Sequence, residues 1–172
     1  MHFNPYGGMA AEIAVALVNM EPGAPPEAIA ETLRAHDYRP LGVVEPGQAV
    51  ELLRWAGRLR PVFTDDDLDR RVRTVNDLLA ATASRPYVSR HDGRAPHLHF
   101  AHEGDALVDR LKAYTATGLA HVICQDHTRL GVCGRPGCDV VYVDTSRNGR
   151  RRFCALRCAN RVYVAGHRSR HA

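Results

Sequence analysis

The sequence contains almost no lysine: of its 23 basic side chains, Lys112 is the single lysine and the others are arginines. It also has no apolar run of the roughly twenty residues that a membrane-spanning helix needs. Its first residues show neither the basic segment nor the apolar segment of a secretory signal. We therefore expect a cytoplasmic protein without a membrane partner.

Motifs typical of the common enzyme classes are absent as well. The sequence has no P-loop, no GxGxxG, no GxSxG and no cysteine–histidine pairing that would indicate a nucleophile. Its 172 residues are 45% hydrophobic and 24% charged, a composition typical of one globular domain with a small appended module. We expect that the chain is not an enzyme, although an enzymatic N-terminal domain stays open as an alternative.

Cysteine is scarce, yet four of the five cysteines lie close together in the sequence. Their spacing is Cys133-x4-Cys138-x15-Cys154-x3-Cys158. In a reducing compartment, clustered cysteines hold metal more often than they form disulfides. Because four thiolates close the tetrahedral shell of Zn²⁺, the spacing predicts one structural zinc ion. The remaining Cys124 lies in an apolar helical pattern, and we expect it to be a buried thiol that does not bind the metal.

The residues around the two cysteine pairs predict how this module folds. The first pair encloses two glycines and a proline, which favour a tight turn, and the second pair is spaced by one helical turn. Val140–Val143 has the composition of a strand, and Asn148-Gly149 is typical of a hairpin turn. The order of knuckle, hairpin and helix predicts a treble-clef-like zinc finger over residues 128–172.

Charge is distributed unevenly along the chain. Residues 133–172 carry nine arginines against two aspartates, a net charge of +7, whereas the rest holds 14 basic and 17 acidic side chains, a net charge of −3. A guanidinium binds phosphate through two parallel hydrogen bonds, so the segment predicts DNA as a partner, with a merely solvated basic face as the alternative. Tyr142, Phe153 and Tyr163 are expected to fill the small core and not to stack on bases. The candidate nucleic-acid contacts are the arginines of the predicted hairpin and the following helix: Arg147, Arg150, Arg151, Arg152, Arg157, Arg161, Arg168 and Arg170.

Residues 1–127 predict a helix-rich domain. Gly118 is expected to interrupt or bend the last helix, and Tyr87–Arg90 and His97–Phe100 resemble two short strands. The predicted class is therefore α+β: a helix-rich N-terminal domain with a small β-hairpin, followed by the zinc finger. Apolar residues at helical spacing predict helices at Met9–Met20, from Pro26, from Pro46 to Pro61, after an N-cap at Thr64, and from about Asp105 to Asp126.

Three histidines gather at the second predicted strand. His97 and His99 share one strand face, and His102 follows closely. One hypothesis is a ligand or metal site formed by these three side chains. The other, which we favour, is a polar strand face packed over a helix, because ten histidines in the chain make some clustering unsurprising.

The C-terminal segment resembles the CGNR zinc finger family. The similarity is carried by the two cysteine pairs, by Asp144 ahead of the predicted turn, by an Arg-Arg-aromatic-Cys step and by Cys158-Ala159-Asn160-Arg161. The resemblance implies that the four cysteines are zinc ligands and that Asn160 and Arg161 are the signature pair. Ala159 stands where the family has glycine, and in a helix this change costs nothing.

In that family the finger follows an N-terminal ABATE domain, and residues 1–127 have the matching size and position. The resemblance implies a DNA-binding transcription regulator of the stress response, whose N-terminal domain senses a small-molecule effector or forms a homodimer. The alternative is a small-molecule-binding or enzymatic N-terminal domain, with the finger serving protein–protein interaction or stability.

Overall fold

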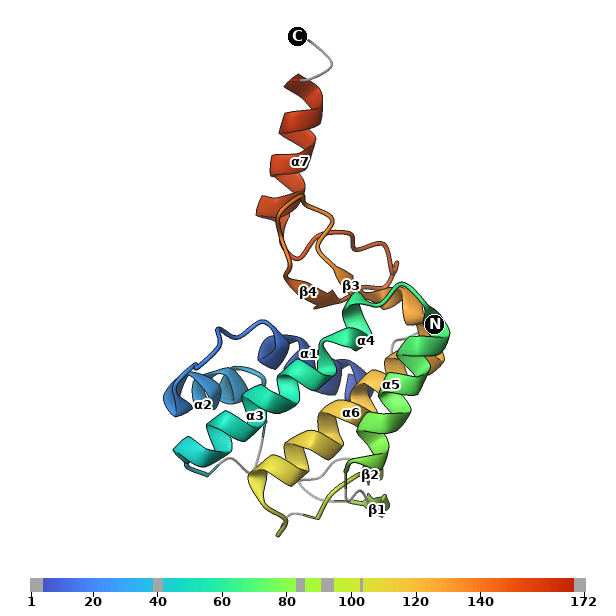
Figure 1. Ribbon diagram of the computed structural model, residues 1–172. Coiled ribbons are helices and arrows are strands. Elements are labelled where there is room, and N and C mark those ends of the chain that lie inside the picture. The colour runs from blue at the N-terminus through green and yellow to red at the C-terminus, as the bar shows by residue number, and fades with distance from the viewer. Residues whose placement is uncertain (1–4, 39–41, 83–85, 91–94, 103, 169–172) are drawn as a thin grey trace.

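Helices form most of the chain in the computed structural model, which describes residues 5–38, 42–82, 86–90, 95–102 and 104–168 (Figure 1). The helix-rich α+β class is confirmed. Among the described helices, none is both long and apolar enough to cross a bilayer. In chain order the first helices are α1 (Pro5–Val18), α2 (Pro26–Ala35), α3 (Pro46–Leu59), α4 (Pro61–Thr64), α5 (Leu68–Ala80) and α6 (Leu107–Asp126).

Two small antiparallel hairpins complete the fold, one on each side of α6 in the sequence. The first pairs β1 (Tyr87–Ser89) with β2 (His97–His99), as the sequence predicted. After α6, the 3-10 turn η1 (His127–Arg129) leads into β3 (Leu130–Val132), which pairs with β4 (Val141–Val143). The last element is α7 (Leu156–Arg168), which points away from the helical body in Figure 1.

The first four helices, α1 included, all begin at a proline, which has no backbone N–H to leave unpaired in the first turn. Helices α2, α3 and α4 begin at Pro26, Pro46 and Pro61. The predicted N-cap at Thr64 is wrong, since Thr64 ends the short helix α4. Asp67 caps α5 instead, where its Oδ1 accepts a hydrogen bond from the backbone N–H of Arg70 at 2.9 Å.

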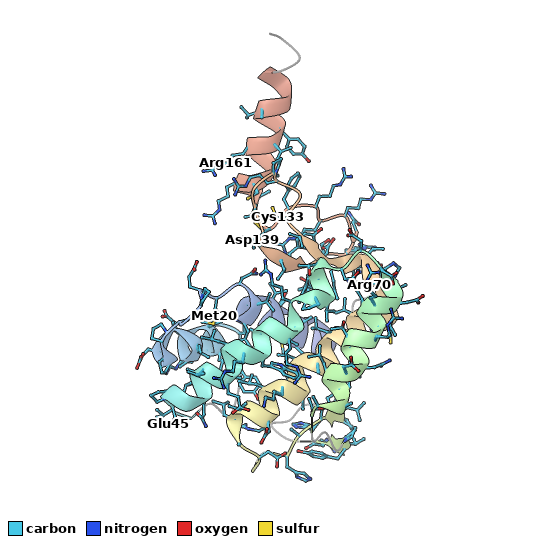
Figure 2. The ribbon with its side chains drawn as sticks, viewed as in Figure 1. Met20, Glu45, Arg70, Cys133, Asp139 and Arg161 are labelled. Carbon is cyan, nitrogen blue, oxygen red and sulfur yellow. The ribbon has the colours of Figure 1, made fainter. Side chains whose placement is uncertain are left out.

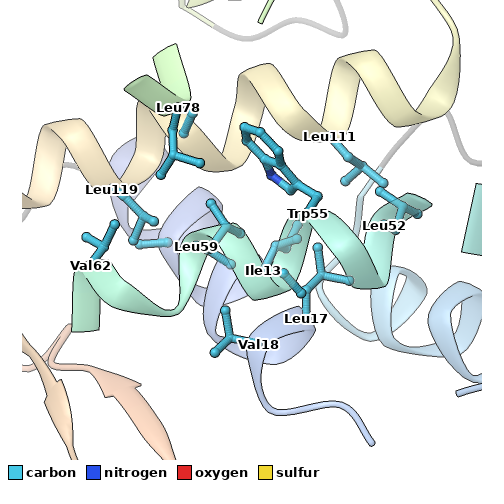
Figure 3. Packing of buried hydrophobic residues seen from close by; sticks show 14 of the residues in the cluster. Ile13, Leu17, Val18, Leu52, Trp55, Leu59, Val62, Leu78, Leu111 and Leu119 are labelled. Carbon is cyan, nitrogen blue, oxygen red and sulfur yellow. The ribbon is translucent and has the colours of Figure 1, made fainter. Parts of the chain in front are cut away.

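The core lies between α1, α3 and α6, with α2, α4 and α5 around them (Figure 3). Trp55 of α3 is 2% exposed. Its indole Nε1 donates to Thr115 Oγ1 of α6 at 2.9 Å, and that hydroxyl donates to the carbonyl of Leu111 at 2.7 Å. The polar atom of the buried Trp55 side chain is therefore paired, as burial requires.

Gly118 does not interrupt α6, contrary to the prediction, because its role is packing. The helix runs through it without a break, and Gly118 is buried against α1. A Cβ at this position would lie 2.4 Å from the Cβ of Ala10 and 2.8 Å from the backbone N of Ala11. Gly118 therefore sets how closely α1 and α6 approach each other.

Cys124 is exposed near the end of α6, so the prediction of a buried thiol is wrong. Val122 is fully buried, and successive helical residues rotate by about 100°. Position 124 therefore turns roughly 200° away from the face that Val122 buries.

Replacing Gly118 with alanine should destabilise the fold although alanine favours helix. The new methyl group meets α1, and overpacking of this kind costs about 1–3 kcal/mol, against a helix-propensity gain of at most about 1 kcal/mol. Gly57→Ala is the matched control, because Gly57 lies in α3 with nothing within 4 Å of a new Cβ. In thermal and urea unfolding, the stability of Gly118→Ala should be lower than that of the wild type, and the stability of Gly57→Ala should be equal or higher. Equal stabilisation by both changes would contradict the close approach.

Candidate metal centre and basic surface

The turn of the β3–β4 hairpin holds the first two cysteines. In the register of the strands, Val132 pairs with Val141, and Cys133 and Cys138 follow in the connecting segment. The backbone N–H of Cys133 donates to the carbonyl of Val140 at 2.9 Å, and Gly137 takes a positive φ of 72° that favours glycine. The hairpin therefore encloses the knuckle, whereas the sequence predicted a hairpin after it.

The expected turn at Asn148-Gly149 forms, but not as a β-hairpin. Gly149 has a φ of 59°, yet no described residue between it and α7 is in a strand. The side chain of Arg129 fills the inside of this loop. Its Nη1 donates to the carbonyls of Asp144 at 2.9 Å and Ser146 at 2.7 Å. The loop wraps a guanidinium instead of pairing with β4.

Four sulfur atoms converge at the junction of the hairpin and α7. The Sγ atoms of Cys133, Cys138, Cys154 and Cys158 all lie within 4.8 Å of one another. The distance from Cys154 Sγ is 3.9 Å to Cys138 Sγ and 3.6 Å to Cys158 Sγ. Tetrahedral zinc with Zn–S bonds of about 2.3 Å requires S···S separations of about 3.8 Å. The four predicted ligands thus match one structural zinc site, and Cys124 lies outside this group.

The pKa values of two of these thiols, Cys138 and Cys154, are shifted in opposite directions. A hydrogen bond from the backbone of Val140, outweighing the effect of burial, lowers the pKa of Cys138 to about 7. Burial, together with the adjacent sulfurs, raises the pKa of Cys154 to about 12. When thiols share a small volume, each negative charge disfavours the next, and this effect adds to burial in raising the pKa of Cys154. A divalent cation removes this conflict by holding all four as thiolates.

Asp144 organises the loop between β4 and α7. It is 2% exposed, and its carboxylate accepts the backbone N–H groups of Ser146 at 2.9 Å and Arg151 at 2.7 Å. Burial acts to raise the pKa of Asp144, but hydrogen bonds from Ser146 and Arg151 outweigh it and leave the pKa below its usual value. A buried aspartate accepting backbone N–H groups two and seven residues ahead fixes the course of the whole loop.

Arg151 is part of this framework although its side chain reaches the surface. Its Nε donates to the carbonyl of Phe153 at 3.0 Å and its Nη1 to that of Val143 at 3.3 Å, while Nη2 bonds the carbonyl of Cys154. Its guanidinium also lies 5.4 Å from the ring centre of Tyr142. One arginine therefore joins β4 to the segment that delivers a zinc ligand.

The hairpin is joined to the helical body by apolar and polar contacts. Leu130, Val141 and Val143 belong to the same buried cluster as α1, α3 and α6. At the end of α1, Asn19 Nδ2 donates to the carbonyl of Val141, and the N–H of Val141 donates to Asn19 Oδ1, both at 2.9 Å. Arg60 Nη2 donates to the carbonyl of Asp139 at 2.8 Å. Sequence reasoning missed these contacts, since a lone asparagine after a helix has no distinguishing pattern.

Besides Arg151, five of the predicted arginines are exposed on the finger, and together they are here called the basic surface: Arg147, Arg150, Arg152, Arg157 and Arg161. The first three lie on the loop after β4, and the other two on α7, where Figure 2 shows Arg161. Arg168 lies in the last turn of α7, but its side chain is not among those described, and Arg170 lies outside the described residues.

The three aromatic residues of the finger have different surroundings. Tyr142 is 8% exposed, and its hydroxyl donates to the carbonyl of Arg151 at 2.8 Å, as expected of a core residue. Phe153 is half-buried and meets Tyr163 edge to face, with ring centres 5.9 Å apart. Tyr163 itself is 64% exposed. The expectation that all three fill the core is therefore wrong for Tyr163, because α7 extends beyond the finger's small core.

The histidines near β2 surround a tyrosine. The rings of His99 and His102 lie 5.2 Å and 4.8 Å from that of Tyr87. The side chain of His97 is not among those described. Among the described side chains, the four cysteines are the only group of three or more potential metal ligands that lie close together. The three-histidine site stays a hypothesis.

Comparison with known families identifies the finger. Residues 129–171 match the CGNR zinc finger, so this part of the chain is a finger of that family. Ala159, in place of the signature glycine, lies in the first turns of α7, where alanine is favourable. The match covers about a quarter of the chain and leaves the helical body unassigned, so the ABATE domain stays a prediction. No curated protein matches the chain at a significant level.

Loss of one ligand should remove the metal and weaken the whole fold. Cys158→Ser should lower the zinc content from about one ion per chain to a small fraction of that, because four thiolates supply roughly 10–16 kcal/mol of apparent binding energy. The melting temperature of the helical signal should fall too, since β3 and β4 share the body's core. Elemental analysis and circular dichroism measure both. Cys124→Ser is the matched control and should change neither. A full zinc complement in Cys158→Ser would refute the assignment.

Two neighbouring arginines should behave differently when replaced by glutamine. Arg151→Gln removes charged hydrogen bonds to backbone carbonyls, and we expect about 1–3 kcal/mol of lost stability and faster zinc loss to a chelator. Arg152→Gln should stay within about 0.5 kcal/mol of the wild type, as expected for an exposed side chain away from such contacts. Equal effects of both changes would mean that Arg151 has no framework role.

Proposed function

We propose that the protein is a DNA-binding regulator that holds the phosphate backbone with the basic surface of its zinc finger. The observation that supports this most directly is that these five arginines are exposed on one small module. No acidic residue follows Asp144 in the sequence, so no carboxylate on the later loop or on α7 competes for their guanidinium groups. Arginine suits this role because its planar fork matches the oxygens of a phosphate.

The helical body has a different part in the proposal. Residues 1–132, which contain this body, carry a net charge of −3 that disfavours phosphate contact. We assign the body to sensing a small-molecule effector or to forming a homodimer. No catalytic step is assigned to the chain. The proposal places the protein in the cytoplasm, where thiols stay reduced and available to zinc.

If the basic surface binds phosphates, the affinity for DNA should fall as salt rises. Removing positive charge from this surface should weaken binding, whereas removing it elsewhere should not. Each phosphate contact contributes about 0.9 to the slope of log affinity against log salt. The triple variant Arg150→Gln, Arg152→Gln, Arg157→Gln should bind duplex DNA more weakly. The magnitude of its slope of log affinity against log salt should be smaller by up to about 2.7. Fluorescence anisotropy with mixed-sequence DNA at several salt concentrations measures both quantities.

A second triple variant supplies the control for net charge. Arg34, Arg54 and Arg73 are exposed on the helical body, and their replacement by glutamine removes the same number of charges. This variant should bind DNA like the wild type. If the two triple variants are equally weakened, the effect is one of overall charge. If neither is weakened, the basic surface is only solvated.

A further inference from the structure

We infer that α7 reads DNA sequence: its exposed face around Leu156, Asn160 and Val164 enters the major groove, and Asn160 contacts the edge of an adenine. The inference rests on the proposed function, but goes beyond it, because the phosphate contacts described above carry no information about sequence.

The face itself is unusual for a helix in water. Leu156 is 83% exposed, Tyr163 is 64% exposed and Val164 is 51% exposed. At about 100° per residue, these positions and Asn160 fall within an arc of roughly 100° on α7. Asn160 lies near the middle of the arc, is exposed, and makes no side-chain hydrogen bond to another part of the chain that the structure describes.

Arginines border this face and indicate what covers it. Arg157 and Arg161 are exposed along one edge of the arc, next to Val164. A partner that meets this face must therefore present both negative charge and a surface for apolar contact. The major groove does so, with phosphates along its walls and thymine methyl groups among the base edges.

The position of α7 permits such an approach. The helix is held to the metal centre through Cys158 in its first turn and through the contact between Phe153 and Tyr163. Beyond that point it projects away from the helical body (Figure 1). Its 13 residues span about 20 Å, and a helix about 10–12 Å in diameter fits a groove about 12 Å wide.

The side chains available on the face suggest which bases are read. The Nδ2 of an asparagine amide donates to adenine N7 while its Oδ1 accepts from the adenine N6 amino group, and aliphatic side chains contact the methyl group of thymine. We therefore expect an adenine opposite Asn160, with thymines near Leu156 and Val164. An anionic membrane is the competing partner, but a helix that lies in a membrane surface needs an unbroken apolar face, and Asn160 interrupts this one.

The test is selection of bound sequences from random duplex DNA with the zinc-loaded full chain. The wild type should enrich a motif that contains adenine. Asn160→Ala should keep the salt slope but lose roughly 5- to 150-fold of the discrimination at that position. Leu156→Ala with Val164→Ala should weaken the preference for thymine. Alanine favours helix at each position, and zinc content and circular dichroism check that the variants are folded.

Two control variants separate the reading face from general effects. Ala165→Gln changes the side of α7 opposite Leu156, and Val50→Ala removes methyl groups from a valine that is 49% exposed on α3. Both should select the wild-type motif, and a changed motif with either control would contradict the assignment of the face.

The remaining outcomes distinguish this inference from the proposed function. Salt-sensitive binding without any enriched motif, or an unchanged motif with Asn160→Ala, overturns the reading role of α7 and leaves phosphate binding standing. A wild type that binds no duplex DNA at low salt overturns both. Binding to phosphatidylserine vesicles that Leu156→Ala abolishes, with no DNA motif, would assign the face to a membrane.

Discussion

Four sulfur atoms around one ion determine the geometry of the C-terminal quarter of the chain. Two come from the turn of a hairpin, one from the segment just before α7 and one from the first turn of α7, so a single tetrahedral centre fixes the angle between the hairpin and the helix. The finger buries few side chains of its own. The direction of α7, and with it the placement of Arg157 and Arg161, therefore depends on the metal more than on apolar packing.

The hairpin is in turn held by the helical body. Burial of Leu130, Val141 and Val143 contributes roughly 5–9 kcal/mol, at about 1.5–3 kcal/mol for each side chain. That is the same order as the roughly 10–16 kcal/mol of a structural zinc site. The paired hydrogen bonds of Asn19 with Val141 add a fixed register between α1 and β4. The chain thus changes from helix to hairpin near residue 127, but the buried residues before and after this point belong to one core.

Sequence patterns predicted those features that depend on neighbours in the chain. Cysteine spacing identified the metal centre, and prolines identified the starts of α2 and α3, because both follow from local backbone geometry. Contacts between distant segments were beyond such reasoning. The helical pattern alone did not show that Gly118 faces Ala10, and the Asn148-Gly149 turn gave no sign that Arg129 would fill its loop. Cys124 shows the remaining difficulty, since apolar neighbours in a helix do not share its face.

Arginine serves two purposes in this finger, and composition alone does not separate them. Arg151 uses its guanidinium to join three backbone carbonyls, a task for which the single nitrogen of lysine is unsuited. Such an arginine adds to the net charge of +7 without offering its donors to a partner. Apart from Arg151, the exposed arginines described in the finger are the five of the basic surface, and these are available to phosphates. If all five bind, the salt slope contributed by these residues is at most about 4.5, a smaller value than the arginine content alone would suggest.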